Sequence, residues 1–477
     1  MLFPTLVFAQ FFVVVFVVNW FTRPHPRLWR VSMLAASFFF YGYWNWRFVF
    51  LLVGSILINW WLGQQVVEAR RAGRDAARRV WVRTAVFANL GVLGLFKYYD
   101  FFAVEFSNLL NDLGLGSTAS VLELTLPIGI SFFTFQAMSY VIDLGRGHIG
   151  AMGFLDFAVY LSFFPQLVAG PIVRASEMAP QLAIRPDPRF VQSAEAFRLI
   201  FAGLFKKVVI SSYLADQIVD DVFADPAGHS GWEVLIGVYG YAIQIYADFS
   251  GYTDIAIGVA LLLGFRFPQN FDAPYRALSL QDFWRRWHMT LSNWLRDYLY
   301  IPLGGNRRGT LLTYRNLLLT MLLGGLWHGA SWTFVVWGAI HGGVLALERL
   351  WSSSGLGRGL MTGVPIEIRR GLRWLLTFHV VCLAWVFFRA ETFGDATDLL
   401  GQLGSFGGSN RLVTPLLLMV IFGAIASQFV PMSWVRSAEE NLVRAGWLVQ
   451  GVAIGVGLVV VDTLGPDGVA PFIYFQF

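Results

Sequence analysis

The sequence has little charge and almost no cysteine. Only 14% of its 477 residues are Asp, Glu, Lys or Arg, whereas a soluble domain carries about 25%. A soluble multi-domain enzyme is therefore excluded, because so few charged residues cannot cover a surface that faces water. The one cysteine, Cys382, excludes an intrachain disulfide and a metal site built from cysteines. The net charge of +5 reflects loop orientation in a membrane protein, and we expect no nucleic-acid partner.

Signals of several other protein classes are also missing. The N-terminal run MLFPTLVFAQFFVVVFVVNWF has no basic leader and no A-x-A cleavage site, so residues 2–21 are predicted to be a retained first span. No segment repeats at a fixed period, and we predict a single domain over residues 1–477. The sequence has no G-x-S-x-G elbow and no histidines at the spacing of zinc ligands, so we expect no bound metal.

Apolar residues dominate the chain and set its fold class. They make up 56% of the sequence and form many continuous runs, each close to the length of about 20 residues that crosses a bilayer as a helix. Such runs exclude an outer-membrane barrel, whose strands alternate in hydrophobicity. The sequence predicts an all-α, polytopic membrane helix bundle with roughly ten to thirteen inserted helices, some of them half-spanning. Basic loops at residues 22–30 and 68–83 are expected on the cytoplasmic side.

Two apolar runs contain features that are costly inside a membrane. The run from 152 to 170 is interrupted by Pro165, which predicts a break in a helix. The run from 232 to 265 carries Asp248 and Asp254 around Ser250-Gly251, where we expect a second break. The two carboxylates could cap the ends of a broken helix, bind a cation or orient a histidine.

The stretch of residues 282–341 contains three of the seven histidines. Residues 281–300 are predicted to form one interfacial amphipathic helix with His288 on its apolar stripe. His328 follows a long apolar run within Gly-Gly-Leu-Trp-His-Gly, and an ionisable group at such a position is a functional candidate by default. We predict that His328 is a catalytic base and that His288 lies near it. A core histidine with one partner is the alternative for both, and His341 is expected to be structural.

Arginines flank this stretch. Arg285 and Arg286 precede His288, and Arg307 and Arg308 lie in a short turn that is expected on the cytoplasmic side. A guanidinium group matches phosphate oxygens in a fork, so the four arginines are candidates to bind the phosphates of a nucleotide-bearing acyl donor. Anchoring of cytoplasmic loops is the alternative.

A single imidazole in a dry cavity suits acyl transfer. It can remove a proton from a hydroxyl group that attacks an activated carbonyl, and general-base assistance of this kind contributes about 10²–10⁴-fold in rate. Exclusion of water protects the activated ester from hydrolysis.

The longer motifs of the sequence resemble those of a known protein family. The sequence resembles the membrane-bound O-acyltransferases and, among them, the membrane subunits of bacterial alginate O-acetyltransferases. The likeness covers nearly the full length, and its motifs are FKYYDFF at 96–102, LPIGISF at 126–132, FPQLVAGPI at 164–172, DFSGY at 248–252, the whole of 282–329 and FIYF at 472–475. The resemblance matches His328 to the essential histidine of the family and His288 to its second, histidine or asparagine, position.

The resemblance also implies an architecture and a set of partners. It implies a ring of helices around a tunnel in the bacterial inner membrane, with acetyl-CoA or another activated donor as a co-substrate from the cytoplasm. It implies an extracytoplasmic polysaccharide as acceptor, helped by a periplasmic hydrolase-like partner protein. Transfer to peptidoglycan and transfer of D-alanine to teichoic acid are the alternatives within the family.

The sequence leaves open two hypotheses from other functional classes. A transporter of a glycan or lipid would use charged groups along its path, and the sequence offers Lys206, Lys207, Asp248 and Asp254. A passive assembly scaffold would need no histidine chemistry. Loss of His328 would then leave its function intact.

Overall fold

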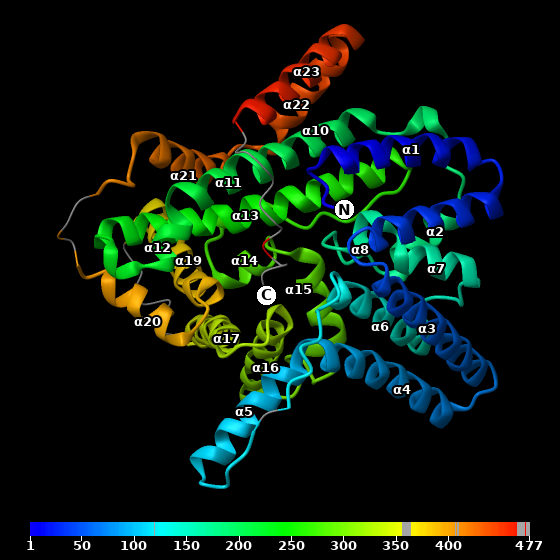
Figure 1. Ribbon diagram of the computed structural model, residues 1–477, viewed down its shortest axis with the longest axis horizontal. Helices are drawn as coiled ribbons and strands as arrows, with labels where there is room; N and C mark the ends of the chain where they lie inside the picture. Colours follow the sequence, from blue (N-terminus) through cyan, green and yellow to red (C-terminus); the bar gives the residue numbers. More distant parts are fainter. Residues whose placement is uncertain (119, 355–363, 406, 408–409, 465–472, 474–477) are drawn as a thin grey trace. The chain divides into compact units, whose positions relative to one another are not determined.

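The computed structural model describes residues 1–477 except 119, 355–363, 406, 408–409, 465–472 and 474–477. Every regular element in the described part of the chain is a helix, so the prediction of an all-α fold is confirmed (Figure 1). The chain forms two compact units, Met1–Ile200 with Ile255–Pro268 and Phe201–Asp254 with Gln269–Phe477. The helices Ser193–Leu204 and Gly231–Leu262 each supply residues to both units. The single domain over residues 1–477 stays a prediction.

The first unit is a set of apolar helices joined mostly by short loops. The break expected near Pro165 is confirmed, since one helix ends at Ser162 and the next begins at Phe164 with the proline in its first turn. The helices of this unit are α1 (Leu6–Thr22), α2 (Pro26–Gly42), α3 (Arg47–Arg71), α4 (Asp75–Leu93), α5 (Tyr99–Asp112), α6 (Ile130–Arg146), α7 (Phe154–Ser162), α8 (Phe164–Leu167) and α9 (Ala175–Ala183).

The second unit contains the histidine-rich stretch. The α-helices that lie wholly in this unit are α11 (Ser212–Leu214), α12 (Asp220–Ala224), α14 (Leu280–Trp284), α15 (Met289–Leu295), α16 (Thr310–His328), α17 (Trp332–Ser353), α19 (Ile366–Arg389), α20 (Phe393–Gln402), α21 (Pro415–Ser427), α22 (Met432–Arg444) and α23 (Trp447–Leu464). The helices shared between the units are α10 (Ser193–Leu204) and α13 (Gly231–Leu262). Three π-helical turns, Phe205–Ser211, Ala215–Val219 and Arg296–Tyr300, continue the helices before them.

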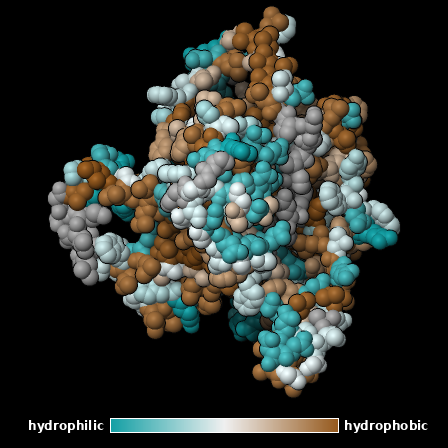
Figure 2. Space-filling view, turned by 60° about the vertical axis from the view of Figure 1, so that its left-hand side comes forward, coloured by the Kyte–Doolittle hydropathy of each residue, from teal (hydrophilic) through white to brown (hydrophobic). Residues whose placement is uncertain are grey.

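Several helices are long and apolar enough to cross a membrane. The π-helical turn Gly94–Tyr98 joins α4 and α5 into one helix, Asp75–Asp112. In the described part of the chain five helices meet this test, namely Arg47–Arg71, Asp75–Asp112, Gly231–Leu262, Ile366–Arg389 and Trp447–Leu464. A pair bent by 95°, Pro415–Ser427 with Met432–Leu442, would make a sixth. Many large hydrophobic side chains are exposed, as expected for a surface in contact with lipid, and Figure 2 shows extended brown patches of them beside teal, hydrophilic areas. The prediction of a polytopic membrane protein is thus supported, whereas the ring, the tunnel and the higher helix count stay predictions.

Helix α13 runs unbroken through the position where a break was expected. Gly251 does not end the helix, and the prediction of a break at Ser250-Gly251 is wrong. A Cβ atom added at Gly251 would lie 2.7 Å from the carbonyl oxygen of Gly203. The glycine is therefore needed for close packing against α10, and the helix keeps its hydrogen bonds through this contact.

Helices α16 and α17 form a tightly packed hairpin that carries His328 at the end of its first arm (Figure 1). Two glycines on opposite arms allow the close approach. A Cβ atom at Gly325 would lie 2.2 Å from the carbonyl oxygen of Phe334, and one at Gly338 would lie 2.4 Å from that of Met321. Backbone therefore packs directly on backbone beside His328, which fixes where the imidazole sits.

Replacement of Gly325 by alanine is expected to destabilise this hairpin. The added methyl group overlaps a backbone oxygen, so the helices must separate, and overpacking of this kind costs about 1–3 kcal/mol. Gly343→Ala on α17 is the matched control, because a Cβ atom there meets nothing within 4 Å. The free energy of unfolding in detergent should fall for the first variant only. Equal stability of the two variants would contradict the packing described here.

Candidate functional site

The predicted helix over residues 281–300 is wrong, because the chain turns sharply at His288. Helix α14 ends at Trp284, α15 begins at Met289, and His288 between them has φ 42° and ψ 54°. A left-handed backbone is unfavourable for a residue other than glycine, so neighbouring contacts must hold it. Asn270 supplies one of them, since its carbonyl oxygen accepts a hydrogen bond from the backbone N–H of Met289 at 2.9 Å.

The side chain of Asn270 also orients the imidazole of His288. Its Oδ1 accepts from the backbone N–H of Thr290 at 3.2 Å and from the hydroxyl of Thr290 at 2.9 Å. Because a backbone N–H can only donate, this end of the amide is the oxygen. The Nδ1 atom of His288 lies 3.1 Å from the same oxygen and must therefore carry the proton. The neutral ring then has its lone pair on Nε2, which is the form of an acceptor or a base.

His288 is fully buried among aromatic rings. Its ring lies edge-on to Phe249, with centroids 4.7 Å apart, and parallel to Phe271 at 6.5 Å. Burial lowers the pKa of His288 to about 3, since the charged form loses its hydration. The imidazole is therefore neutral at physiological pH.

His328 is the last residue of α16 and is 4% exposed. Its ring lies edge-on to those of Trp327, Trp337 and Phe388, at centroid distances of 5.0, 5.0 and 5.1 Å. These contacts come from α16, α17 and α19, so three helices fix the position of the imidazole. Aromatic walls of this kind exclude water from the imidazole.

Trp327 brings the two predicted histidines together. Its ring centroid lies 6.0 Å from that of His288 and 5.0 Å from that of His328. The two imidazoles, predicted from positions forty residues apart in sequence, thus flank one indole. Their roles in chemistry remain predictions, but their convergence is an observed feature of the second unit.

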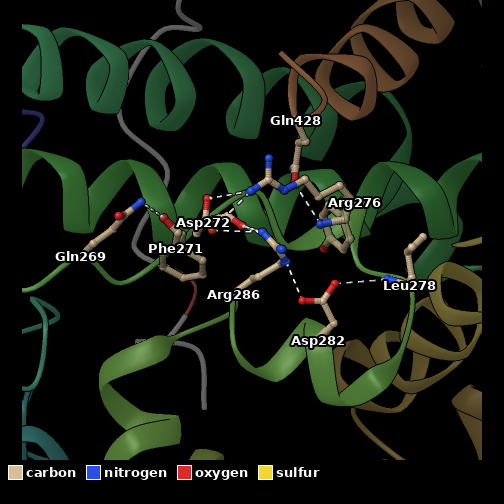
Figure 3. Close-up of polar contacts among 9 residues, drawn as sticks. Gln269, Phe271, Asp272, Arg276, Leu278, Asp282, Arg286 and Gln428 are labelled. Carbon is tan, nitrogen blue, oxygen red and sulfur yellow. Dashed lines mark hydrogen bonds and ion pairs between the residues drawn. The ribbon is translucent and has the colours of Figure 1, made fainter. Parts of the chain in front are cut away.

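The four arginines have different surroundings. Arg286 is held by two carboxylates, with Nε donating to Asp282 at 2.9 Å and Nη1 donating to Asp272 at 3.0 Å (Figure 3). Arg276 donates to the same Asp272 at 3.3 Å. By contrast, the side chains of the other three predicted arginines are exposed: Arg285, Arg307 and Arg308.

Four charged residues that the sequence offered to a transport path form two ion pairs instead. Lys207 donates to Asp248, and both side chains are 2% exposed. Asp248 also accepts a hydrogen bond from the hydroxyl of Ser211 at 3.4 Å. Lys206 donates to Asp254 at 2.5 Å, and these two side chains are about one-fifth exposed. The carboxylates therefore pair with two lysines and do not cap a broken helix.

Sequence reasoning missed several residues that build this site. Asn270 lies in a loop 18 residues before His288, and nothing in its neighbourhood marks it as the residue that orients an imidazole. Trp337 and Phe388 gave no signal beyond hydrophobicity. His341, expected to be structural, lies in the same aromatic cluster, with its ring centroid 4.6 Å from that of Trp337. Among the residues that the structure describes, no three histidine, cysteine, aspartate or glutamate side chains gather as a metal site would require.

The sequence also matches known proteins. The profile of the membrane-bound O-acyltransferase (MBOAT) family matches residues 120–354. The chain is 37% identical to a probable alginate O-acetylase of Azotobacter vinelandii, with all of both chains covered. It is 39% identical to a peptidoglycan O-acetyltransferase of Helicobacter pylori, over 80% of this chain and 75% of that one. A teichoic acid D-alanyltransferase of Streptococcus thermophilus is 27% identical over 55% of this chain and 68% of its own.

Proposed function

Because the chain belongs to the membrane-bound O-acyltransferase family, we propose that it moves an acetyl group from cytoplasmic acetyl-CoA to a hydroxyl group of an extracytoplasmic polysaccharide. The family makes it an acyltransferase. The choice of an alginate-like acceptor rests on the relative from Azotobacter vinelandii, which is 37% identical over the full length of both chains. The bacterial inner membrane is the site at which a cytoplasmic donor and a polymer outside the cell could both be reached.

The observation that carries the chemistry is the convergence of His288 and His328 on Trp327. In the proposed reaction His328 takes the proton of the attacking hydroxyl as the new C–O bond forms at the carbonyl carbon. The C–S bond of the thioester then breaks, and the proton passes to the departing thiolate, giving an ester and free CoA. His288, neutral and with a lone pair on Nε2, is suited to accept a hydrogen bond from a second hydroxyl group of the acceptor sugar.

The donor is proposed to bind through phosphate contacts of Arg285, Arg307 and Arg308. Their exposed guanidinium groups are open to a ligand from the aqueous side. Arg286 contacts two carboxylates, so its proposed contact with phosphate would have to compete with these ion pairs. A periplasmic hydrolase-like protein is the proposed partner that completes transfer to the polymer.

Replacement of Arg285 by glutamine is expected to raise the KM for acetyl-CoA about tenfold and to leave kcat within twofold. Loss of one charge-assisted hydrogen bond to phosphate costs about 1.5 kcal/mol, which is close to a tenfold change in affinity. Arg286→Gln is the comparison. It breaks two ion pairs and should lower the stability of the protein, and it should raise the KM for acetyl-CoA less than Arg285→Gln does. Initial rates over a range of acetyl-CoA concentrations give both constants. An unchanged KM for Arg285→Gln would assign that residue to loop anchoring.

Two related activities are alternatives within the family. The 39% identity to a peptidoglycan O-acetyltransferase favours the same donor with a different acceptor, and the weaker likeness to a teichoic acid D-alanyltransferase favours a different acyl group. Membranes that contain this chain and its partner can be given acetyl-CoA labelled in the acetyl group. We expect label in alkali-labile esters of an exopolysaccharide. Label in peptidoglycan, or transfer only of D-alanine from a carrier protein, would replace the proposal with the corresponding alternative.

The transporter hypothesis finds no support in the arrangement of charges. Lys207 and Asp248 are buried together, and the neighbouring Lys206 pairs with Asp254, six residues further along α13. Paired charges with little exposure are suited to holding helices together and poorly suited to passing a substrate along.

A further inference from the structure

A third histidine of the second unit has its protonation form set by a neighbour. The indole Nε1 of Trp284 lies 3.3 Å from Nδ1 of His341 and donates a hydrogen bond to it. Tryptophan can only donate, so Nδ1 of His341 is the acceptor and carries no proton. The neutral ring therefore carries its proton on Nε2. This is the opposite form from His288, whose proton is on Nδ1.

The resulting N–H of His341 is buried and lacks an acceptor among the described residues. His341 is 0% exposed, and its Nε2 has no hydrogen-bond partner in that part of the chain. The same holds for Nε1 of Trp337, which is 1% exposed and is also a donor only. A buried donor without an acceptor costs about 1–3 kcal/mol, so two of them together call for an explanation.

The two donors lie on one face of α17 beside His328. Trp337 and His341 are four residues apart, and their ring centroids are 4.6 Å apart. On its other contacts Trp337 lies edge-on to His328, with centroids 5.0 Å apart. The indole of Trp337 thus lies between the imidazole of His328, the proposed base, and that of His341, and contacts both.

We infer that Nε2–H of His341 and Nε1–H of Trp337 bind the carbonyl oxygen of the acyl group during transfer. The inference rests on the proposed function and extends it with two further catalytic residues. As the hydroxyl oxygen bonds to the carbonyl carbon, the C=O π electrons move onto the carbonyl oxygen, and the two N–H groups stabilise the negative charge. As the C–S bond breaks, the electron pair on the oxygen re-forms the C=O π bond and the negative charge leaves on the thiolate sulfur, so neither donor loses its proton.

This arrangement explains why both residues are polar in an otherwise apolar cluster. An oxyanion is stabilised strongly by fixed donors in a site that excludes water, because the donors need no reorganisation during the reaction. Trp284 contributes as a positioning residue, since its hydrogen bond keeps the proton of His341 on the nitrogen that is proposed to face the substrate.

Two variants of His341 separate this role from packing. His341→Phe keeps an aromatic ring but removes the donor, whereas His341→Gln retains an amide N–H near the position of Nε2. With acetyl-CoA as the varied substrate, we expect His341→Phe to lower kcat about 10²-fold with KM within threefold of wild type, as for loss of one oxyanion donor. His341→Gln should recover at least tenfold of that loss. The detergent melting temperature of each variant provides the measure of folding.

Trp337→Phe gives an independent test should His341→Phe fail to fold, since it removes only the Nε1 donor and keeps a ring against His328. We expect a loss of kcat of at least tenfold. A wild-type kcat in Trp337→Phe would overturn the inference. So would equal losses of kcat in His341→Phe and His341→Gln that parallel equal decreases in melting temperature. No transfer from acetyl-CoA by the wild-type protein would instead overturn the proposed function, and the inference with it.

Discussion

Replacement of His328 by alanine is expected to lower O-acetylation of the polymer by about 10²–10⁴-fold while the amount of polymer exported stays unchanged. The range is that of general-base assistance by one positioned side chain. The imidazole is 4% exposed and lies against three aromatic rings, so no water or neighbouring base can take its place without rearrangement. Ester content per mass of secreted polymer is the measurement.

His379→Ala is the matched control. This imidazole also lies in an apolar run, but it is exposed, and its Nδ1 and Nε2 contact the carbonyl oxygen of Leu375 and the hydroxyl of Tyr239 at 2.8 and 2.7 Å. We expect wild-type acetylation. If His328→Ala acetylates normally while export fails, a transporter is the better account. If neither acetylation nor export changes in a folded His328→Ala variant, the scaffold hypothesis is favoured.

Replacement of Asp248 by alanine is expected to cause the largest loss of stability in the second unit. It would leave the ammonium group of Lys207 buried without its main counter-charge, and breaking a buried pair in this way costs about 3–5 kcal/mol. It would also remove the acceptor for the backbone N–H of Ile473, which lies 2.8 Å from Asp248 Oδ2. Unfolding in mixed detergent micelles should therefore begin at a markedly lower denaturant fraction.

The double variant Lys207→Met/Asp248→Asn tests the electrostatic cause. It removes both charges and retains an oxygen that can accept from Ile473, so we expect most of the lost stability to return. Glu440→Gln is the surface control, because its pair with Arg444 is 3.8 Å long and both side chains are largely exposed, and it should change stability by no more than about 0.5 kcal/mol. A double variant as unstable as Asp248→Ala would contradict this explanation.

The all-helical fold and two of the site's three histidines could be predicted from local sequence. Continuous apolar runs report helices in lipid directly, and an imidazole at the end of such a run is conspicuous wherever the chain folds. Pro165 predicted a break because proline acts on the backbone of its own neighbours. Each of these signals is contained in a window of fewer than about 20 residues.

The errors arose where distant residues decide local structure. The turn at His288 depends on Asn270, and without that side chain the pattern of residues 281–300 indicates a single helix. Gly251 looked like a helix break, but its partner is the carbonyl of Gly203 on another helix. Asp248 lies 41 residues from Lys207, so the pairing that makes its burial tolerable cannot be read from its own surroundings.

His341 illustrates how structure adds chemistry to a residue without a sequence signal. On its own helix it is one polar residue in an apolar run. The hydrogen bond from Trp284, 57 residues earlier, sets its proton on Nε2, and its ring packs against Trp337, which in turn contacts His328. The hydrogen bond from Trp284 and the contact with Trp337 both depend on the fold of the second unit.

The most direct test of the central claim compares purified wild-type protein with His328→Ala, each with its partner and polymer. The label is in the acetyl group of acetyl-CoA, and both samples are matched for folded protein. The account predicts that wild-type protein forms labelled, alkali-labile polymer esters with release of one CoA thiol for each ester, and that the variant forms about 10²–10⁴-fold fewer. Equal rates of ester formation by the two proteins would contradict it.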